Sequence, residues 1–390
     1  MSTQTLQKWN RVKLGDVADI NMGQSPQSRF YNLNEEGLPF FQGVTEFGQM
    51  FPTIKQWTSK ITKTANAGDI LFSVRAPVGR VNYSREKICI GRGLASMRAK
   101  EKYLNQIYLF YLLKNEEKNL ILQSGGAIYD SINKDALNDF DISIPSIPIQ
   151  KFIADTLSNY DNLIENNTCR VQILEQMAQA IYQDAFASST GKSVPLGEAI
   201  TIHRGKSYGS HELSDVDGIP FVNLKCIVRD GGFRKSGLKR FTGSYKDTQK
   251  VVAGDIVMAV TDMTQDRRIV ARAARIPTLE GGFGVISMDL VKIEPKEGND
   301  KDYIYSLLRW SGFPDEVKNH ANGANVLHLI PGRITDYKTS VAPTDQQKEF
   351  GKKVGPLLGL IDKLELQNES LRQSRDMLIP KLVMGEIIVK

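Results

Sequence analysis

The sequence predicts an α+β protein in which two repeated mixed α/β domains are joined by two long antiparallel coiled-coil helices, related by an approximate two-fold axis. The predictors are a repeated order of short apolar segments, two long apolar seams of helical period, and a small polar stretch between the halves. At 390 residues the chain is long enough for two domains and a connector. We expect a first domain at 1–145, a central long helix at 146–187, a linker and second domain at 188–343, and a C-terminal long helix and tail at 344–390.

The same order of short segments occurs in both halves. Each half opens with an apolar segment and a polar loop, continues with a turn and a strand-like run, and then carries a helix, a Gly-rich loop and a closing strand. The matching segments are 14–20 and 196–202, 39–42 and 220–223, 67–74 and 253–260, 103–114 and 303–310, 124–127 and 322–325, and 142–145 and 340–343. The skeleton therefore repeats, whereas the loop contents differ.

Two stretches place apolar residues at alternating steps of four and three, the period of a long helix that packs against another helix. A shift of 197 residues (350 − 153 = 197) superimposes one stretch on the other, and a Gln-Lys pair shortly after a proline precedes both. The predicted seam of the pair comprises Ile153, Leu157, Tyr160, Ile164, Val171, Leu174, Ala178, Ile181, Ala185, Phe350, Val354, Leu357, Ile361, Leu364, Leu371, Leu378 and Leu382, with Asn167, Asn368 and Arg375 as polar members that restrict register. From Gln150 to Phe186 the first helix would be about 55 Å long. Because this exceeds either globular segment, we expect the two helices to pair.

Two segments interrupt this pattern. Gly351, Gly355, Pro356 and Gly359 weaken the start of the second helix. Because an internal proline removes a helical hydrogen bond and clashes with the preceding turn, we expect a kink or a delayed start, with regular helix from Leu357. The small polar residues 187–193 predict a linker between the first helix and the second domain.

Composition indicates a cytoplasmic globular protein. Hydrophobic residues make up 41% and charged residues 24% of the chain, and no apolar run approaches the roughly 20 residues of a membrane span. The first residues lack the pattern of a signal peptide. The three scattered cysteines fit neither a disulfide framework nor zinc-ligand spacing. A net charge of +6 permits a polyanionic partner without requiring one.

Catalytic motifs are not found at the spacing their chemistry needs. Residues 190–193 end like a nucleotide-binding P-loop, but the first glycine of that motif would fall at Phe186, inside the helical seam. Residues 314–318 contain the letters of a nuclease motif without the spacing that separates its carboxylates. The four histidines all lie in the second half without a partner at metal-ligand spacing. We therefore expect no catalytic centre, no metal and no cofactor on this chain.

The polar loops contain side chains of the kind that bind base edges and phosphates. Arg75 and Arg80 flank a short turn at the end of an apolar strand, a rigid position from which to aim a guanidinium group. The candidate DNA-binding residues are Gln24, Ser25, Gln27, Arg29, Gln42, Arg75, Arg80, Arg92 and Tyr129 in the first half, and Arg204, Lys206, Tyr208, His211, Asn223, Lys225, Arg234, Lys235, Gln265, Arg267 and Arg268 in the second.

The chain resembles the specificity (S) subunit of type I restriction–modification enzymes. The resemblance rests on residues 14–17, 67–79, 124–126 ahead of 142–151, and 378–387, and it extends from Val12 to Ile387. It implies two target-recognition domains, each recognising one half of a bipartite, asymmetric site in double-stranded DNA. The helix pair is then expected to set the spacing between half-sites and to dock modification (M) subunits.

The resemblance also implies that this chain is non-catalytic. S-adenosylmethionine, ATP and Mg are expected on the modification (M) and motor/restriction (R) subunits only. Two alternatives remain open from the residues themselves. One is a two-headed coiled-coil protein that binds proteins or glycans and not DNA. The other is a self-sufficient nuclease or methyltransferase, which the missing motifs disfavour.

Overall fold

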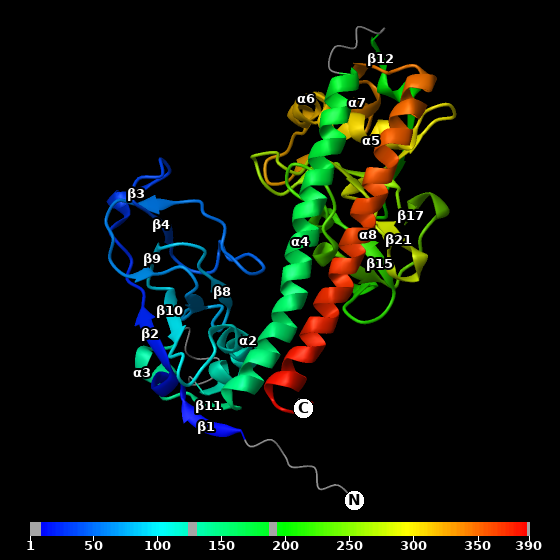
Figure 1. Ribbon diagram of the computed structural model, residues 1–390. Helices are drawn as coiled ribbons and strands as arrows, with labels where there is room; N and C mark the ends of the chain where they lie inside the picture. Colours follow the sequence, from blue (N-terminus) through cyan, green and yellow to red (C-terminus); the bar gives the residue numbers. More distant parts are fainter. Residues whose placement is uncertain (1–8, 124–130, 187–192, 388–390) are drawn as a thin grey trace, which may run out of the picture. The chain divides into compact units, whose positions relative to one another are not determined.

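The computed structural model describes residues 9–123, 131–186 and 193–387 of the chain. The chain divides into two compact units, of which unit 1 comprises Met1–Asn166 and Asn368–Lys390 and unit 2 comprises Asn167–Gln367. Most of the predicted linker and one of the predicted Gly-rich loops, 124–127, lie outside the described residues. Figure 1 shows mixed sheets and short helices in both units and the two long helices α4 and α8. The predicted α+β fold class is confirmed.

Unit 1 contains three sheets with short helices beside them. A four-stranded sheet has the order β2-β10-β7-β8 (Ala18–Met22, Leu94–Ala99, Ile70–Ser73, Val81–Tyr83). A five-stranded sheet has the order β3-β5-β4-β9-β6 (Tyr31–Asn32, Trp57–Thr58, Leu38–Phe41, Ile88–Ile90, Thr64–Ala65), and β1 (Asn10–Lys13) pairs with β11 (Asp141–Ile144). The helices are α1 (Leu14–Val17), α2 (Gln106–Gln123) and α3 (Lys134–Asn138).

Unit 2 repeats this arrangement strand for strand. Its four-stranded sheet is β13-β22-β18-β20 (Ile200–Arg204, Leu290–Pro295, Ile256–Ala259, Ala273–Arg275). Its five-stranded sheet is β14-β16-β15-β21-β17 (Leu213–Ser214, Lys239–Phe241, Ile219–Val222, Phe283–Ile286, Lys250–Val252), and β12 (Ser193–Pro195) pairs with β24 (Lys338–Ser340). A further pair joins β19 (Thr261–Asp262) to β23 (Leu327–His328), and the helices are α5 (Lys301–Trp310), α6 (Phe313–Val317) and α7 (Gly332–Thr335). The sequence repeat is therefore a structural repeat.

The Ala-Gly-Asp motif that precedes β7 and β18 has the same function in both units. Gly68 and Gly254 have φ values of +81° and +83°, a left-handed conformation that favours glycine. The aspartate that follows accepts a hydrogen bond from the backbone N–H three residues earlier, at 2.7 Å for Asp69 and 3.0 Å for Asp255. Each aspartate also pairs with a cation on the neighbouring strand, at 2.6 Å from Arg98 and 3.1 Å from Lys292. This motif fixes the start of the central strand, and these residues are consequently structural.

A buried glutamine near the start of each long helix ties it to its own unit. The helices α4 (Ile147–Phe186) and α8 (Thr344–Val383) are each 40 residues long. Gln150 Oε1 accepts from the backbone N–H of Asn105, and Gln347 Oε1 accepts from that of Asp300, at the first turns of α2 and α5 respectively. Both amides also donate to the carbonyl that lies five residues earlier in the chain. The Gln-Lys pair seen in the sequence therefore marks a joint between the long helix and its sheet.

The delayed start predicted for the second helix is wrong. Helix α8 begins at Thr344 and continues through Pro356. The packing of α8 explains two of its glycines: a Cβ on Gly351 would lie 2.5 Å from the carboxylate of Asp300, and one on Gly355 would lie 2.8 Å from that of Asp302. Proline and glycine lower the stability of this part of α8, but the glycines allow α8 to approach the first turn of α5 closely.

Many of the predicted seam positions are buried, but at others a neighbouring residue on the helix is buried instead. Ile153, Leu157, Ile164, Ala178, Phe350, Val354, Ile361, Leu364 and Leu382 are buried, as are the polar members Asn167, Asn368 and Arg375. Tyr160, Val171, Leu174, Ile181, Leu357, Leu371 and Leu378 are only half-buried, and Ala185 is exposed. Asp161, Tyr182, Leu358 and Ile379 take buried positions in their place. The helices pack on their sheets as well as on each other, which turns the buried face away from the strict seam.

Polar contacts show that the helices run antiparallel. In unit 1 Asn368 Nδ2 donates to the carbonyl of Ile164 at 3.3 Å, and Arg375 pairs with Asp161. In unit 2 Asn167 donates to Gln367 at 3.2 Å. Positions that ascend on one helix meet positions that descend on the other, as predicted.

A buried ion pair joins the two long helices in unit 1. The side chains of Arg375 and Asp161 are 5% and 3% exposed, and the Tyr111 hydroxyl of α2 also donates to Asp161. Burial raises the pKa of Tyr111, and the negative field of Asp161 adds to the rise. The shift of 197 residues places Leu358 and Ala178 at the corresponding positions, and both are buried in the apolar core of unit 2.

Candidate nucleic-acid interface

In unit 1 four chain segments meet where strands of both sheets end. The backbone N–H groups of Gly23 and Gln24 donate to the carbonyls of Leu94 and Ile90, at 2.9 Å each. The turn 91–93 is bonded to the end of β4, through Gly91 N–H to Phe41 and Gly93 N–H to Gln42. Val74, at the end of β7, donates to the carbonyl of Gly93 at 2.9 Å. We call this set of hydrogen bonds the loop frame.

The loop frame brings five of the predicted residues together. Ser25 Oγ bonds to Gln42 Oε1 at 2.9 Å and accepts from the backbone N–H of Arg92 at 3.1 Å. Arg75 follows Val74 and forms a backbone bridge with Ser131. Gln24, Gln42, Arg75 and Arg92 have exposed side chains. The frame therefore displays two guanidinium groups and two amides from rigid backbone.

Glycines make this close approach possible. A Cβ on Gly23 would lie 2.2 Å from the carbonyl oxygen of Gly91, and one on Gly93 would lie 2.5 Å from that of Gln42. Since real Cβ atoms do not approach backbone so closely, larger residues would force these segments apart. The glycines thus allow the close backbone packing that positions the polar side chains.

Unit 2 has the same loop frame. Gly205 and Lys206 donate to the carbonyls of Leu290 and Ile286 at 3.2 and 2.8 Å. Ser287 donates to Val222 at 2.8 Å, and Val260 donates to Asp289 at 2.9 Å. In unit 1 a backbone bridge joins Arg75 to Ser131. The corresponding pairing in unit 2 joins Thr261 of β19 to His328 of β23.

The side chains on this second frame are different. Lys206 stands at the position of Gln24, and Ser287, Met288 and Asp289 replace Gly91, Arg92 and Gly93. Thr261 Oγ1 and Ser287 Oγ donate to the two carboxylate oxygens of Asp289 at 3.1 and 3.3 Å. Sequence reasoning missed Ser287, Met288, Asp289 and His328 because it favoured cationic and amide side chains. The spacing between Ile286 and Leu290, which matches that between Ile90 and Leu94, was the signal that could have found the first three.

A structured loop carries three more predicted residues of unit 2. Buried Asp262 accepts hydrogen bonds from the backbone N–H groups of Thr264, Ile269 and Val270 at 2.9, 2.8 and 3.2 Å. Burial acts to raise the pKa of Asp262, but these hydrogen bonds prevail and lower it. Arg267 on this loop has a φ of +52°, and its Nε is buried without a hydrogen-bond partner among the described residues. Such local strain in a non-glycine residue is typical of functional positions.

The neighbouring residues of this loop already have partners. Gln265 donates to the carbonyl of Ala324 at 3.0 Å, and Arg268 pairs with Asp230 at 2.6 Å. Arg267 is therefore the residue of this loop best placed to bind an anion.

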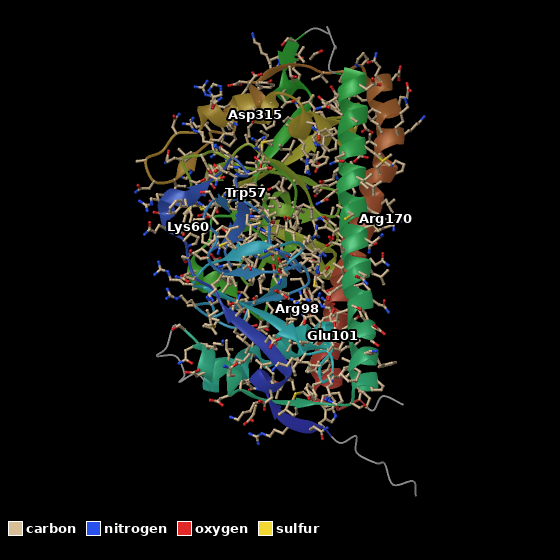
Figure 2. All side chains as sticks on the ribbon, turned by 60° about the vertical axis from the view of Figure 1, so that its left-hand side comes forward. Trp57, Lys60, Arg98, Glu101, Arg170 and Asp315 are labelled. Carbon is tan, nitrogen blue, oxygen red and sulfur yellow. The ribbon has the colours of Figure 1, made fainter. Side chains whose placement is uncertain are left out.

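The other predicted residues of unit 1 lie outside the loop frame. Gln27 and Arg29 are exposed on the next turn, where Arg29 and Lys60 lie 4.9 and 5.3 Å from the ring centre of Phe30. Arg80 pairs with Glu117 of α2 at 3.3 Å, and Tyr129 lies outside the described residues. Figure 2 shows Lys60 and Trp57 well apart from Arg98, the structural partner of Asp69.

The remaining predicted residues of unit 2 divide into exposed and engaged side chains. Arg204, His211 and Lys225 are exposed, and Arg234 donates to the carbonyl of Lys225 from a largely exposed position. Tyr208 packs on Phe221 with ring centres 4.8 Å apart, and Lys235 is half-buried. Asn223 is 7% exposed, and its amide bonds to the backbone of Lys225 and Gly237. We therefore leave Asn223 out of the interface.

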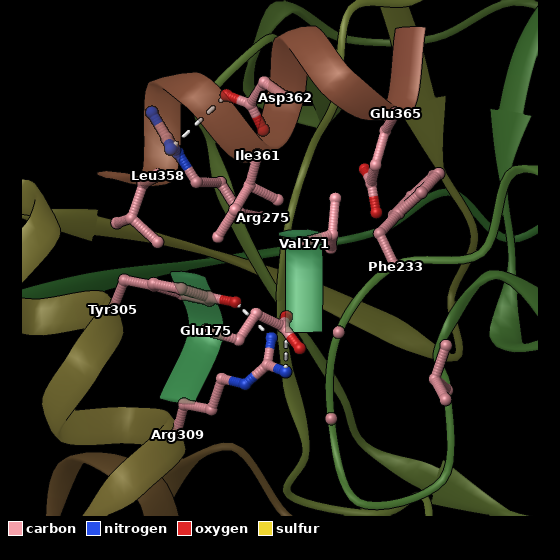
Figure 3. Close-up of a pocket in the computed structure, with 13 residues that line it drawn as sticks. Val171, Glu175, Phe233, Arg275, Tyr305, Arg309, Leu358, Ile361, Asp362 and Glu365 are labelled. Atoms are coloured by element: carbon pink, nitrogen blue, oxygen red, sulfur yellow. Dashed lines mark hydrogen bonds and ion pairs between the residues drawn. The ribbon is translucent and has the colours of Figure 1, made fainter. Parts of the chain in front are cut away.

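A charged pocket of about 200 Å³ in unit 2 serves the long helices. Arg309 of α5 bonds to Glu175 of α4 at 2.9 Å, and Arg275 pairs with Asp362 of α8 at 3.3 Å (Figure 3). Glu365 forms another wall of the pocket. Desolvation at the pocket wall raises the pKa of Glu365 to about 7, although part of the residue is exposed to solvent, and nearby Asp362 and Glu175 contribute to the rise. These residues tie α4 and α8 to the sheet and are separate from the loop frame.

Two further observations concern metal binding and membrane insertion. Among the described residues, His, Cys, Asp and Glu side chains form no group of three or more that could hold a metal ion. No helix in the described part of the chain is long and apolar enough to cross a membrane.

Comparison with known proteins finds similarity to type I specificity subunits. Residues 7–176 match the profile described as "Type I restriction modification DNA specificity domain". The MjaIX specificity subunit of a type I restriction enzyme from Methanocaldococcus jannaschii is 24% identical over 421 residues, which cover 98% of this chain and 94% of that protein. The chain is therefore similar to type I restriction enzyme specificity subunits over nearly its whole length.

The chain is also similar to two other specificity subunits. The MjaX protein of the same archaeon, named as a specificity subunit, is 42% identical over 159 residues, but that match spans only 37% of its length and 40% of this chain. The crystal structure of a type I restriction–modification S subunit from M. genitalium superimposes with a TM-score of 0.62 at 17% identity, covering 98% of both chains. At this identity the superposition shows a shared fold alone.

Proposed function

We propose that the chain is the sequence-specific DNA-recognition subunit of a type I restriction–modification complex, in which each unit recognises one half of a bipartite site. The observation that carries the proposal is the loop frame, in which four of the five backbone hydrogen bonds of unit 1 have counterparts in unit 2 but the displayed side chains differ. Functional residues commonly vary on loops that a rigid scaffold positions. Two copies of one frame with different side chains suit the recognition of two different sequences.

The side chains on the frame of unit 1 have the chemistry of base recognition. A guanidinium group donates two hydrogen bonds to O6 and N7 of guanine in the major groove, and an amide group bonds N6 and N7 of adenine. Arg75 and Arg92 supply the first group, and Gln24 and Gln42 supply the second. Arg267 of unit 2 suits a phosphate, because its Nε has no hydrogen-bond partner in the described part of the chain. The side chains on the frame would thus contact bases, and the neighbouring loops would contact the phosphates of the DNA backbone.

The helix pair sets the distance between the half-sites and docks the modification subunits. Helix α4 keeps large apolar side chains on its solvent face, with Phe152, Leu163, Ile173 and Met177 between 47% and 55% exposed. Exposed apolar rows of this kind are typical of protein–protein contacts. The half-sites are recognised elsewhere, so docking and recognition use separate surfaces.

The chain itself is not an enzyme. Methyl transfer from S-adenosylmethionine takes place on the modification subunits, and ATP- and Mg-dependent translocation and cleavage take place on the restriction subunits. The whole complex works in the cytoplasm, where the cellular DNA lies.

Selection of bound DNA from a library tests the proposal. The library has two randomised half-sites and a variable spacer, and the full chain is used with and without modification subunits. We expect two fixed sequences at a constant separation, and binding that weakens steeply with salt through counterion release. Mapping of methylated genomic sites in cells with and without the chain should yield the same bipartite sequence.

Three results would contradict the proposal. Enrichment of no sequence by the assembled complex would exclude specific recognition. Binding to a protein or glycan partner with little salt dependence would favour the two-headed interaction protein. Methyl transfer or ATP hydrolysis by the pure chain would favour the self-sufficient enzyme.

A further inference from the structure

Asp289 is the acidic group at the centre of the loop frame of unit 2. Its backbone carbonyl accepts from Val260 N–H at 2.9 Å, which fixes it at the junction of two strand ends. The hydroxyl groups of Thr261 and Ser287 hold its two carboxylate oxygens at 3.1 and 3.3 Å. The side chain is half-buried, and neighbouring Met288 is 52% exposed. The carboxylate is therefore held rigidly at the edge of an open surface.

The carboxylate keeps hydrogen-bonding capacity beyond these contacts. A carboxylate offers about four lone-pair sites, and the two hydroxyl groups occupy one on each oxygen. The corresponding residue of unit 1 is Gly93, so the loop frame does not require a side chain at this position. A role in stabilising the loop frame therefore does not explain why unit 2 has an aspartate at position 289.

A fixed negative charge is unfavourable on a surface that meets phosphates, unless it binds a donor on the nucleic acid. In the major groove the donors are the exocyclic amino groups, N4 of cytosine and N6 of adenine. Guanine and thymine present acceptors at those places and would repel the carboxylate. The charge thus both attracts one class of base and rejects the other.

We propose that Asp289 is a specificity-determining residue of unit 2, which accepts a hydrogen bond from the amino group of a cytosine or adenine in its half-site. The inference rests on the proposed DNA recognition and deepens it. Thr261 and Ser287 are positioning residues for the carboxylate, and Met288 lies beside the bound base edge.

The test is selection of DNA by the full chain assembled with modification subunits, in parallel for the wild type, Asp289→Asn and Asp289→Gly. The amide keeps the shape of the carboxylate and the acceptor for Thr261, whereas glycine copies the residue that unit 1 carries in the same frame. Asp215→Asn is the matched control, since it removes an exposed aspartate of the same unit outside the frame. Arg92→Gln identifies the half-site of unit 1.

We expect one position of the unit 2 half-site to require cytosine or adenine in the wild type. Asp289→Gly should relax that position by about 5- to 150-fold, the discrimination carried by one good base contact, and Asp289→Asn should no longer reject guanine and thymine, because its amide can also donate a hydrogen bond. Asp289→Asn should also bind non-specific DNA more tightly, by about threefold at low salt, because one repulsive charge is gone. Asp215→Asn should leave the base preference unchanged.

The inference fails if the wild type recognises both half-sites but neither Asp289 variant changes any base preference. It also fails if the altered position prefers guanine or thymine in the wild type. These outcomes leave the proposed function intact, whereas enrichment of no sequence by the wild type refutes the proposed function itself.

Discussion

The buried ion pair of unit 1 allows a sharp test of how the helix pair is held together. Removing the guanidinium group by Arg375→Met keeps much of the aliphatic volume but leaves the buried carboxylate of Asp161 without its cation, although the Tyr111 hydroxyl still donates to it. Loss of one partner from a buried pair costs about 3–5 kcal/mol because the remaining charge is uncompensated. An exposed pair such as Arg11 with Asp141 should cost only about 0–1 kcal/mol.

Unit 2 supplies the compensating variant. Its corresponding positions hold Leu358 and Ala178 within an apolar core. Asp161→Leu combined with Arg375→Met should therefore recover most of the loss, since apolar replacement of a buried pair is often neutral or stabilising. Tyr111→Phe added to the double variant removes the hydroxyl that would otherwise stay unpaired, a further gain of about 1–3 kcal/mol.

Urea and thermal unfolding of the full chain, followed by circular dichroism and tryptophan fluorescence, measure these differences. For a unit of nearly 200 residues, a loss of 3–5 kcal/mol should lower the Tm by about 6–20 °C. Arg11→Met serves as the exposed control. A loss below about 1 kcal/mol for Arg375→Met, or a double variant no more stable than the single one, would refute the reasoning.

Three other perturbations test separate parts of the structure. Because the pKa of Glu365 is raised in the folded state, the unfolded chain loses the carboxyl proton at lower pH than the folded chain does. The free energy of unfolding of unit 2 should therefore decrease as the pH rises from about 4.5 to 7. Glu365→Gln should reduce that fall in urea midpoints measured at pH 5 and 8, while Glu101→Gln should not. Gln347→Leu should cost about 1–3 kcal/mol, because the first turn of α5 loses its buried acceptor; an unchanged urea midpoint would contradict this. Arg75→Ala should weaken one half-site alone by about 1–3 kcal/mol in competition binding, whereas equal losses for all sequences would indicate a phosphate contact.

A heptad inserted at both unit boundaries, between Asn166 and Asn167 and between Gln367 and Asn368, tests the spacing role of the helices. The insertion leaves the internal contacts of each unit in place and keeps the helical period. At 1.5 Å per residue it adds about 10 Å, so the selected spacer should lengthen by about three base pairs while the half-sites stay the same. An unchanged spacer would show that the helices do not set the distance.

The sequence predicted the repeat and the helices because those depend on local periodicity. Ala-Gly-Asp before a β-strand is recognisable from the sequence because the turn needs a left-handed glycine. Helix α8 was misjudged at Pro356 because the compensating contacts, from Gly351 and Gly355 to the first turn of α5, are tertiary. Burial of Asp161 was missed for a similar reason, since its partners are distant in sequence.

The candidate interface was predicted only where the frame displays long polar side chains. Gln24, Gln42, Arg75 and Arg92 met the expectation that DNA-binding residues are cationic or amide-bearing. Asp289 did not meet it, because an acidic residue becomes a candidate only once its place in the frame is known. Asn223 shows the converse error: a polar residue at the matching position proved to be bonded to backbone and buried.

Because backbone forms the loop frame and side chains are displayed on it, substitutions at these two kinds of position have different effects on the candidate interfaces. Gly23 and Gly205 fill the same position, and a Cβ there would lie 2.2 and 2.0 Å from a backbone carbonyl oxygen. Substitutions at such positions displace every side chain on the frame at once. Substitutions at Arg92 or Asp289 instead change one displayed group and leave the hydrogen bonds of the frame in place, because those bonds use the backbone. Under the proposed function, each unit would therefore acquire a new base preference through a few exposed positions, without altering the core, the helix pair or the other unit.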